Sequence, residues 1–162
     1  MPIEQIVTDA EHILLWGLLA TLVLTLVEQG SQGLGLSRLS LPFLIGTWFT
    51  GRRARANLLG FLLNLLGGWV FAFLYFLVLS ALGSVHAWSG ALLGLLHALF
   101  LLVVVLPLLP YVHPRMASTY DGPTRIRRLE PPGFMGLNYG YRTPLTTLVG
   151  HMLYGAILGA LL

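Results

Sequence analysis

The chain has 162 residues and a net charge of +3; 56% of its residues are hydrophobic and only 9% are charged. Soluble domains carry about 25% charged residues, so this composition excludes a water-soluble globule and predicts an integral membrane protein. The chain contains no cysteine and no lysine. This excludes disulfides, iron–sulfur ligation, thiol nucleophiles and Schiff-base lysines.

Four apolar segments follow one another along the chain, each close to the ~20 residues that a helix needs to cross the hydrocarbon core. Their approximate ranges are 12–29, 56–82, 88–109 and 144–162. They predict an all-α fold, a four-transmembrane-helix bundle that forms a single membrane domain over residues 1–162. The N-terminus is acidic and lacks the basic region of a secretory signal, so we expect the first segment to stay as a membrane helix.

The distribution of arginine predicts the orientation of these helices. All nine arginines lie in the first and third connections between the segments, and none lies in the short second connection or at either terminus. Basic loops face the cytoplasm. The sequence therefore predicts two helical hairpins, each closed by a cytoplasmic loop, with both termini outside the cytoplasm.

Two stretches on the predicted cytoplasmic side are unusual. Residues 39–50 are apolar but too short to span a membrane, and we expect Pro42 and Gly46 to break them. They predict an interfacial or re-entrant segment, with Trp48 and Phe49 at headgroup level. Residues 111–143 form a long loop rich in Pro, Gly and Tyr. Its length and its distinctive strings predict an ordered loop that folds back onto the bundle.

Small residues at a spacing of four predict where the helices touch. Gly155 and Gly159 form such a pair in the fourth segment, and Gly90, Gly94 and Ala98 form a stripe in the third. Residues four apart share one helix face, and small side chains let two membrane helices approach closely. We therefore expect these faces to lie inside the bundle.

Four polar side chains of the predicted spans are candidates for an intramembrane cluster: His97, His151, Asn64 and Tyr154. Ionisable groups at bilayer depth usually face protein or a cavity. The two histidines lie close to the midplane, so one interpretation is a hydrogen bond between helices. The alternatives are a bis-histidine haem b or another metal held by His97 and His151, a quinone site, or a route for protons or solute.

At the cytoplasmic face, His113, Arg115 and Glu130 are candidates for contact with a lipid phosphate or a charged group of a partner. A structural interpretation is that Pro107, Pro110 and Pro114 end the third helix and that the loop arginines set the topology. No basic patch interleaved with aromatic residues appears, so nucleic acid is not a predicted partner. No GxSxG elbow or Gly-rich phosphate loop is present either, and the sequence predicts no catalytic activity.

Several strings resemble an uncharacterised family of small bacterial four-span membrane proteins, from about residue 39 to residue 159. They are Leu41-Pro42 with Gly46-Thr47 and Phe49-Thr50, His113-Pro114-Arg115-Met116-Ala117, Leu129-Glu130-Pro131-Pro132-Gly133-Phe134, Leu137-Asn138-Tyr139-Gly140, and His151 with Tyr154-Gly155. The resemblance implies a bacterial inner membrane and assigns no activity. A histidine is common in that family near the position of Asn64, and its absence here argues against a site of three imidazoles.

The sequence thus leaves three functional hypotheses. The first is a helix-packing accessory or assembly subunit of a larger membrane complex, whose partners are lipids, other membrane subunits or a second copy of the chain. The second is a module that binds haem, a metal or a quinone through His97 and His151. The third is a small transporter or channel.

Overall fold

The computed structural model describes residues 3–118 and 122–162, and of residues 3–9 only the backbone. Its elements, in chain order, are α1 (Ile3–Gly33), α2 (Leu41–Thr47), α3 (Arg53–Ala81), α4 (Ala87–Phe100), the π-helix η1 (Leu101–Val105), α5 (Leu106–Val112), the 3-10 helix η2 (Phe134–Tyr139) and α6 (Thr143–Leu161). The predicted all-α class is confirmed, because four of the helical stretches are long and apolar enough to cross a membrane. These stretches are Ala10–Gly33, Arg53–Ala81, Ala87–Val112 and Thr143–Leu161.

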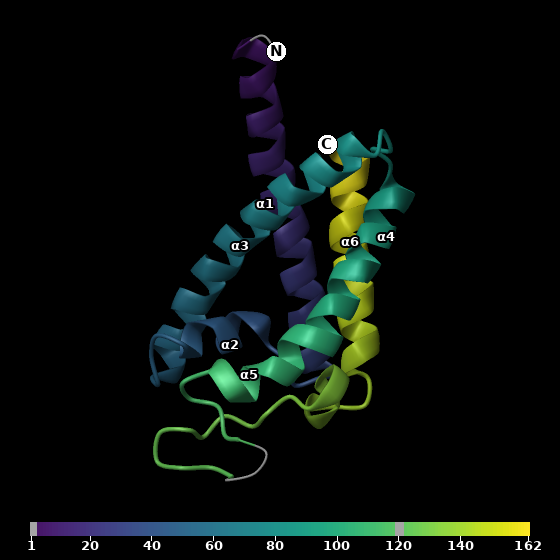
Figure 1. Ribbon diagram of the computed structural model, residues 1–162. Helices are drawn as coiled ribbons and strands as arrows, with labels where there is room; N and C mark the ends of the chain where they lie inside the picture. The colour runs from purple at the N-terminus through teal and green to yellow at the C-terminus, as the bar shows by residue number, and fades with distance from the viewer. Residues whose placement is uncertain (1–2, 119–121) are drawn as a thin grey trace.

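The helices that pack together are not the ones that follow each other in the sequence. α1 lies against both α3 and α6, and α4 lies along α6. α3 and α4 are joined by a short turn but touch only slightly beyond it. In Figure 1 they separate from that turn toward the end of the bundle where α2 and α5 lie. The bundle is therefore closed along α4–α6 and open between α3 and α4–α5.

The two ends of the bundle differ in charge. Both chain termini lie at one end, together with the turn between α3 and α4 (Figure 1). The nine arginines lie at the other end, in the α1–α3 connection, the first turn of α3 and the α5–α6 connection. The separation of charge on which the predicted orientation rests is thus present in three dimensions.

The segment predicted to be broken at Pro42 and Gly46 is instead the helix α2. Pro42 stands in its first turn, where a missing N–H costs nothing, and the Ser40 side chain caps the helix by accepting from Phe43 N. Gly46 lies against the backbone of Ala56, and Gly60 of α3 lies against the carbonyl of Pro42. The two small residues therefore allow α2 and α3 to pack in direct contact, and the expectation of a break was wrong.

The third span runs past its predicted end at residue 109. Pro107 and Pro110 lack the N–H that would bond to the preceding turn, yet the helix continues to Val112. The π-helix η1 ends at Val105, two residues before Pro107. A π-helical turn contains one extra residue and is wider than an α-helical turn. This gives the Pro107 ring room beside the carbonyls of the preceding turn, so the helix continues past it.

The described part of the α5–α6 connection packs onto the bundle, as predicted. Met116 and Tyr139 are buried there against Leu44 of α2, Leu102 of η1 and Leu106 of α5. This second apolar cluster is separate from the one that α1, α3 and α6 form near the centre of the bundle. The loop thus covers the arginine end of the helices.

Candidate functional site

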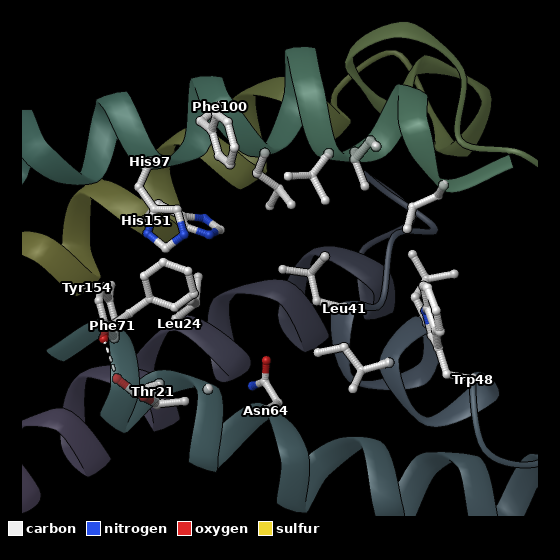
Figure 2. A pocket seen from close by; sticks show the side chains of 18 residues that line it. Thr21, Leu24, Leu41, Trp48, Asn64, Phe71, His97, Phe100, His151 and Tyr154 are labelled. Carbon is white, nitrogen blue, oxygen red and sulfur yellow. Dashed lines mark hydrogen bonds between the residues drawn. The ribbon is translucent and has the colours of Figure 1, made fainter. Parts of the chain in front are cut away.

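The space between α3 and α4–α5 contains a cavity of about 270 Å³. Its walls are the facing sides of α3 and of the α4–η1–α5 span, with α1 and α6 behind and α2 across the arginine end (Figure 2). Nearly all of the lining is apolar, including Leu24, Phe71, Phe100 and Trp48. Ligand sites are typically apolar clefts with a few placed polar groups, and this cavity has that character.

His97 and His151 lie together at one end of the cavity, so the structure brings the two predicted histidines into contact. Their rings are arranged edge to face with centroids 4.9 Å apart. His151 is buried and His97 is partly buried, and both line the cavity. Phe71 lies over the His97 ring, with centroids 4.2 Å apart. This contact follows from the close crossing of α4 and α6, because His97 lies on α4 and His151 lies on α6.

Hydrogen bonds orient both imidazoles. His151 Nδ1 lies 2.9 Å from the carbonyl oxygen of Thr147, which can only accept, so Nδ1 donates and Nε2 of the neutral ring is an acceptor. His97 Nδ1 lies 3.3 Å from the Tyr75 hydroxyl. Within residues 3–118 and 122–162, no hydrogen bond is formed by Nε2 of either ring. Two imidazole nitrogens are therefore available to a molecule in the cavity.

The other two predicted cluster residues also line the cavity but have partners of their own. Asn64 donates from Nδ2 to the Thr25 hydroxyl of α1 over 3.2 Å. Tyr154 donates its hydroxyl to the carbonyl oxygen of Gly68 over 2.7 Å, the dashed line in Figure 2. These two bonds connect α1, α3 and α6. Asn64 and Tyr154 thus hold the wall of the cavity in place and leave the polar end to the histidines.

The geometry does not fit a haem held by both histidines. A haem iron with two axial imidazoles requires the porphyrin plane to lie between the rings, whereas these rings touch each other edge to face. In the part of the chain that the structure describes, no third His, Cys, Asp or Glu joins them to complete a metal site. The arrangement suits hydrogen bonding to a ligand better than coordination.

His113 and Arg115 are engaged with α2, which forms one end of the cavity. His113 is buried, with Nε2 3.2 Å from both the Thr47 hydroxyl and the Leu44 carbonyl. Burial lowers the pKa of His113, and the Arg115 charge lowers it further, against the raising effect of the bond to Leu44. Arg115 Nη1 donates to the carbonyl oxygens of Thr47 and Trp48 over 2.7 and 2.8 Å. The pair therefore satisfies the last carbonyls of α2.

The Glu130 side chain does not join His113 and Arg115. Although Leu129 N donates to the Arg115 carbonyl, the Glu130 carboxylate forms an exposed ion pair with Arg38. Its Oε2 is 2.9 Å from Arg38 Nη1, and Arg38 Nη2 also donates to the Asn138 carbonyl. The Tyr139 hydroxyl donates to the backbone oxygen of Glu130 over 2.6 Å. Burial, and secondarily the Glu130 charge, raises the pKa of Tyr139 to about 12, so this hydroxyl stays a donor at neutral pH. Together these bonds attach the loop to the α1–α2 connection.

Sequence reasoning assigned no site role to two aromatic residues that contact His97: Phe71, which lies over its ring, and Tyr75, whose hydroxyl bonds to its Nδ1. Their spacing carried no signal, since aromatic residues are common along an apolar helix. Sequence reasoning also gave no functional role to Glu28, a buried carboxyl in α1 whose Oε1 has no hydrogen-bond partner among the described residues. Only the tertiary packing distinguishes these side chains from their neighbours.

Comparisons with protein-family models, with curated proteins and with solved structures find no match for this chain.

Proposed function

We propose that the protein binds a membrane-soluble, mostly apolar ligand with a small polar end in the cavity between α3 and α4–α5. The observation that carries the proposal is the position of two imidazole nitrogens without protein partners at one end of an apolar cavity. An apolar ligand without a polar group would leave both nitrogens unbonded in a dry site, which is costly. A ligand hydroxyl can bond to both, because it can donate to His151 Nε2 and accept from His97 Nε2, whereas a carbonyl oxygen can only accept from His97.

A quinone-type ring is the ligand class that these residues favour among the sequence-based hypotheses. His151 Nε2 accepts a hydrogen bond, and His97 Nε2 donates one when the Tyr75 hydroxyl donates to His97 Nδ1. One acceptor and one donor side by side match a quinol hydroxyl, which can donate to His151 Nε2 and accept from His97 Nε2. A quinone carbonyl oxygen can accept from His97 Nε2 alone. Phe71 adds an aromatic face for a flat ring beside the histidines. The remaining walls, with Trp48 at the opposite end of the cavity, suit an alkyl tail (Figure 2).

Filling the cavity tests this proposal directly. Gly67 of α3 lines the cavity, and a Cβ placed on it would meet no atom within 4 Å. Gly67→Leu therefore adds a side chain that enters the cavity, and its Cβ meets no neighbouring atom. We expect saturable quenching of tryptophan fluorescence by decylubiquinone in the purified protein, and an affinity at least tenfold weaker in Gly67→Leu.

The matched control is Gly30→Leu. Gly30 lies on an exposed face of α1, a Cβ there also meets nothing within 4 Å, and the residue does not line the cavity. This variant should bind decylubiquinone like the unchanged protein. Equal affinity for all three proteins, or no saturable quenching in any of them, would overturn the proposal.

The finer sequence-based hypotheses stay predictions. They are a binding role without catalysis, a place as accessory or assembly subunit, and a bacterial inner membrane with both termini outside the cytoplasm. The collection of all arginines at one end of the bundle supports this orientation. Cysteine accessibility at an added N-terminal residue tests the orientation. Isolation from native membranes in mild detergent tests the accessory role, since a lone monomer would count against it.

A further inference from the structure

A second cavity, of about 450 Å³, lies at the arginine end of the bundle and is distinct from the ligand cavity. It is bounded by the end of α1, the α1–α2 connection, α2 and the first two turns of α3. Its lining includes two arginines, Arg38 and Arg53, together with the amides of Gln29 and Asn57. None of the described residues that line it is acidic.

The two arginines of this second cavity differ in whether their guanidinium groups already have protein partners. Arg38 is bonded to Glu130 and to the Asn138 carbonyl. The Arg53 side chain has no hydrogen bond or ion pair with any residue in the described ranges 3–118 and 122–162. The Arg53 guanidinium is thus free to bind an anion from outside the chain. Guanidinium groups match phosphate oxygens with two parallel hydrogen bonds.

The side chains next to Arg53 change character along α3. Arg53, Asn57 and Phe61 are spaced by four and all line the second cavity, so they share one face of the helix. Along ~12 Å of helix the face passes from a cation through an amide to an aromatic ring. Leu58 and Leu62 beside them are exposed apolar side chains. This order matches a phospholipid, whose phosphate is followed by polar esters and then by acyl chains.

We propose that the second cavity binds the phosphate headgroup of a membrane phospholipid, with Arg53 on the phosphate and Asn57 near the ester groups. Free inorganic phosphate shares the anionic chemistry but has nothing to place against Phe61 and Phe43. This places the lipid site at Arg53 and not at Arg115, whose Nη1 already donates to the carbonyls of Thr47 and Trp48.

Native mass spectrometry of the protein in neutral detergent tests the proposal, with short-chain phosphatidylglycerol and inorganic phosphate as probes. We expect one phosphatidylglycerol to bind, Arg53→Gln to weaken its binding at least fivefold, and Asn57→Ala to weaken it less. Arg55→Gln is the matched control, because Arg55 is an exposed arginine of the same turn that does not line the second cavity. It should bind like the unchanged protein.

Two outcomes overturn the lipid site. Equal weakening by Arg53→Gln and Arg55→Gln would show general attraction between charges and no defined site. Inorganic phosphate that binds at the same concentration as the lipid, and displaces it, would show a site for free phosphate. Decylubiquinone binding in the ligand cavity is measured separately, so failure of either proposal leaves the other intact.

Discussion

The crossing of α4 and α6 and the gap between α3 and α4 form a contrast within one bundle. In the crossing, Gly90 and Gly94 of α4 face Gly155 and Gly159 of α6, and the two backbones are in contact. In the gap, Gly67 of α3 faces no atom within 4 Å and borders the ligand cavity. Both regions are rich in glycine and leucine. A glycine therefore closes a contact only where the facing helix also presents backbone, and elsewhere it leaves space.

The contrast also separates two uses of histidine. His151 is buried within the closed crossing, and its ring extends to the edge of the open gap, where it meets His97. The closed crossing fixes the position of both rings and the open gap gives a ligand access to them. Rigid support next to an accessible cavity is the arrangement that a binding site requires.

The largest expected effect is the loss of the closed crossing. A Cβ on Gly94 would collide with the backbone carbonyl of His151, so in Gly94→Val the two helices must separate. We expect a cost of about 3 kcal/mol or more, measured by SDS titration of the detergent-solubilised protein with circular dichroism. Gly30→Val is the control with the same residue change on an open face. Equal stability of Gly94→Val and the unchanged protein would show that the crossing is not tight.

How much of this contrast the sequence predicts depends on the region. Both partners of the closed crossing carry small residues at a spacing of four, so the sequence of each helix predicts the contact. His97 and His151 lie beside this contact. The open gap exists because α3 and α4 do not pack against each other along their length, and this depends on how all four spans are arranged. α1 lies between α3 and α6, and this was not encoded in any local pattern.

The error at Pro42 and Gly46 has the same origin. Read alone, a proline and a glycine predict a break. In the fold, the proline starts α2 and the glycine lets it lie on Ala56 of α3. The loop folds back so that Leu129 N donates to the Arg115 carbonyl, yet the Glu130 carboxylate beside it pairs with Arg38. No local pattern carries information about that choice of partner.

The second prediction concerns α2, which closes the gap at the arginine end. Arg115→Gln removes two charge-assisted hydrogen bonds to the last carbonyls of α2. Because Arg115 is partly exposed to solvent, we expect a loss of about 2 kcal/mol in total and weaker binding of decylubiquinone. Arg125→Gln is the control, since Arg125 is exposed in the loop. The same stability for both variants would show that Arg115 does not hold α2.

The third prediction is a dependence of stability on pH through His113, the other residue that holds α2. Its folded pKa is below the ordinary 6.5 because the ring is buried. As the pH falls through 6.5, the unfolded chain takes up the proton first, so the free energy of unfolding decreases. Between pH 7.5 and 5.5 the melting temperature should therefore fall, and it should fall less in His113→Asn. An equal fall in both proteins would assign the effect to other groups.

The last prediction, which includes the smallest single effect, compares two adjacent glycines of α3, Gly67 and Gly68. Gly67 faces the open cavity, so Gly67→Ala adds no collision and gains helix propensity. We expect it to stabilise the protein by about 0.5–1 kcal/mol. Gly68 lies against the Thr21 side chain of α1, so Gly68→Ala should destabilise it by about 1–3 kcal/mol despite the same gain in propensity. Opposite signs from one substitution at neighbouring positions can only come from what each glycine faces. Two changes of the same sign, measured by SDS titration, would mean that α3 is rotated from this arrangement and that Gly67 does not border an open cavity.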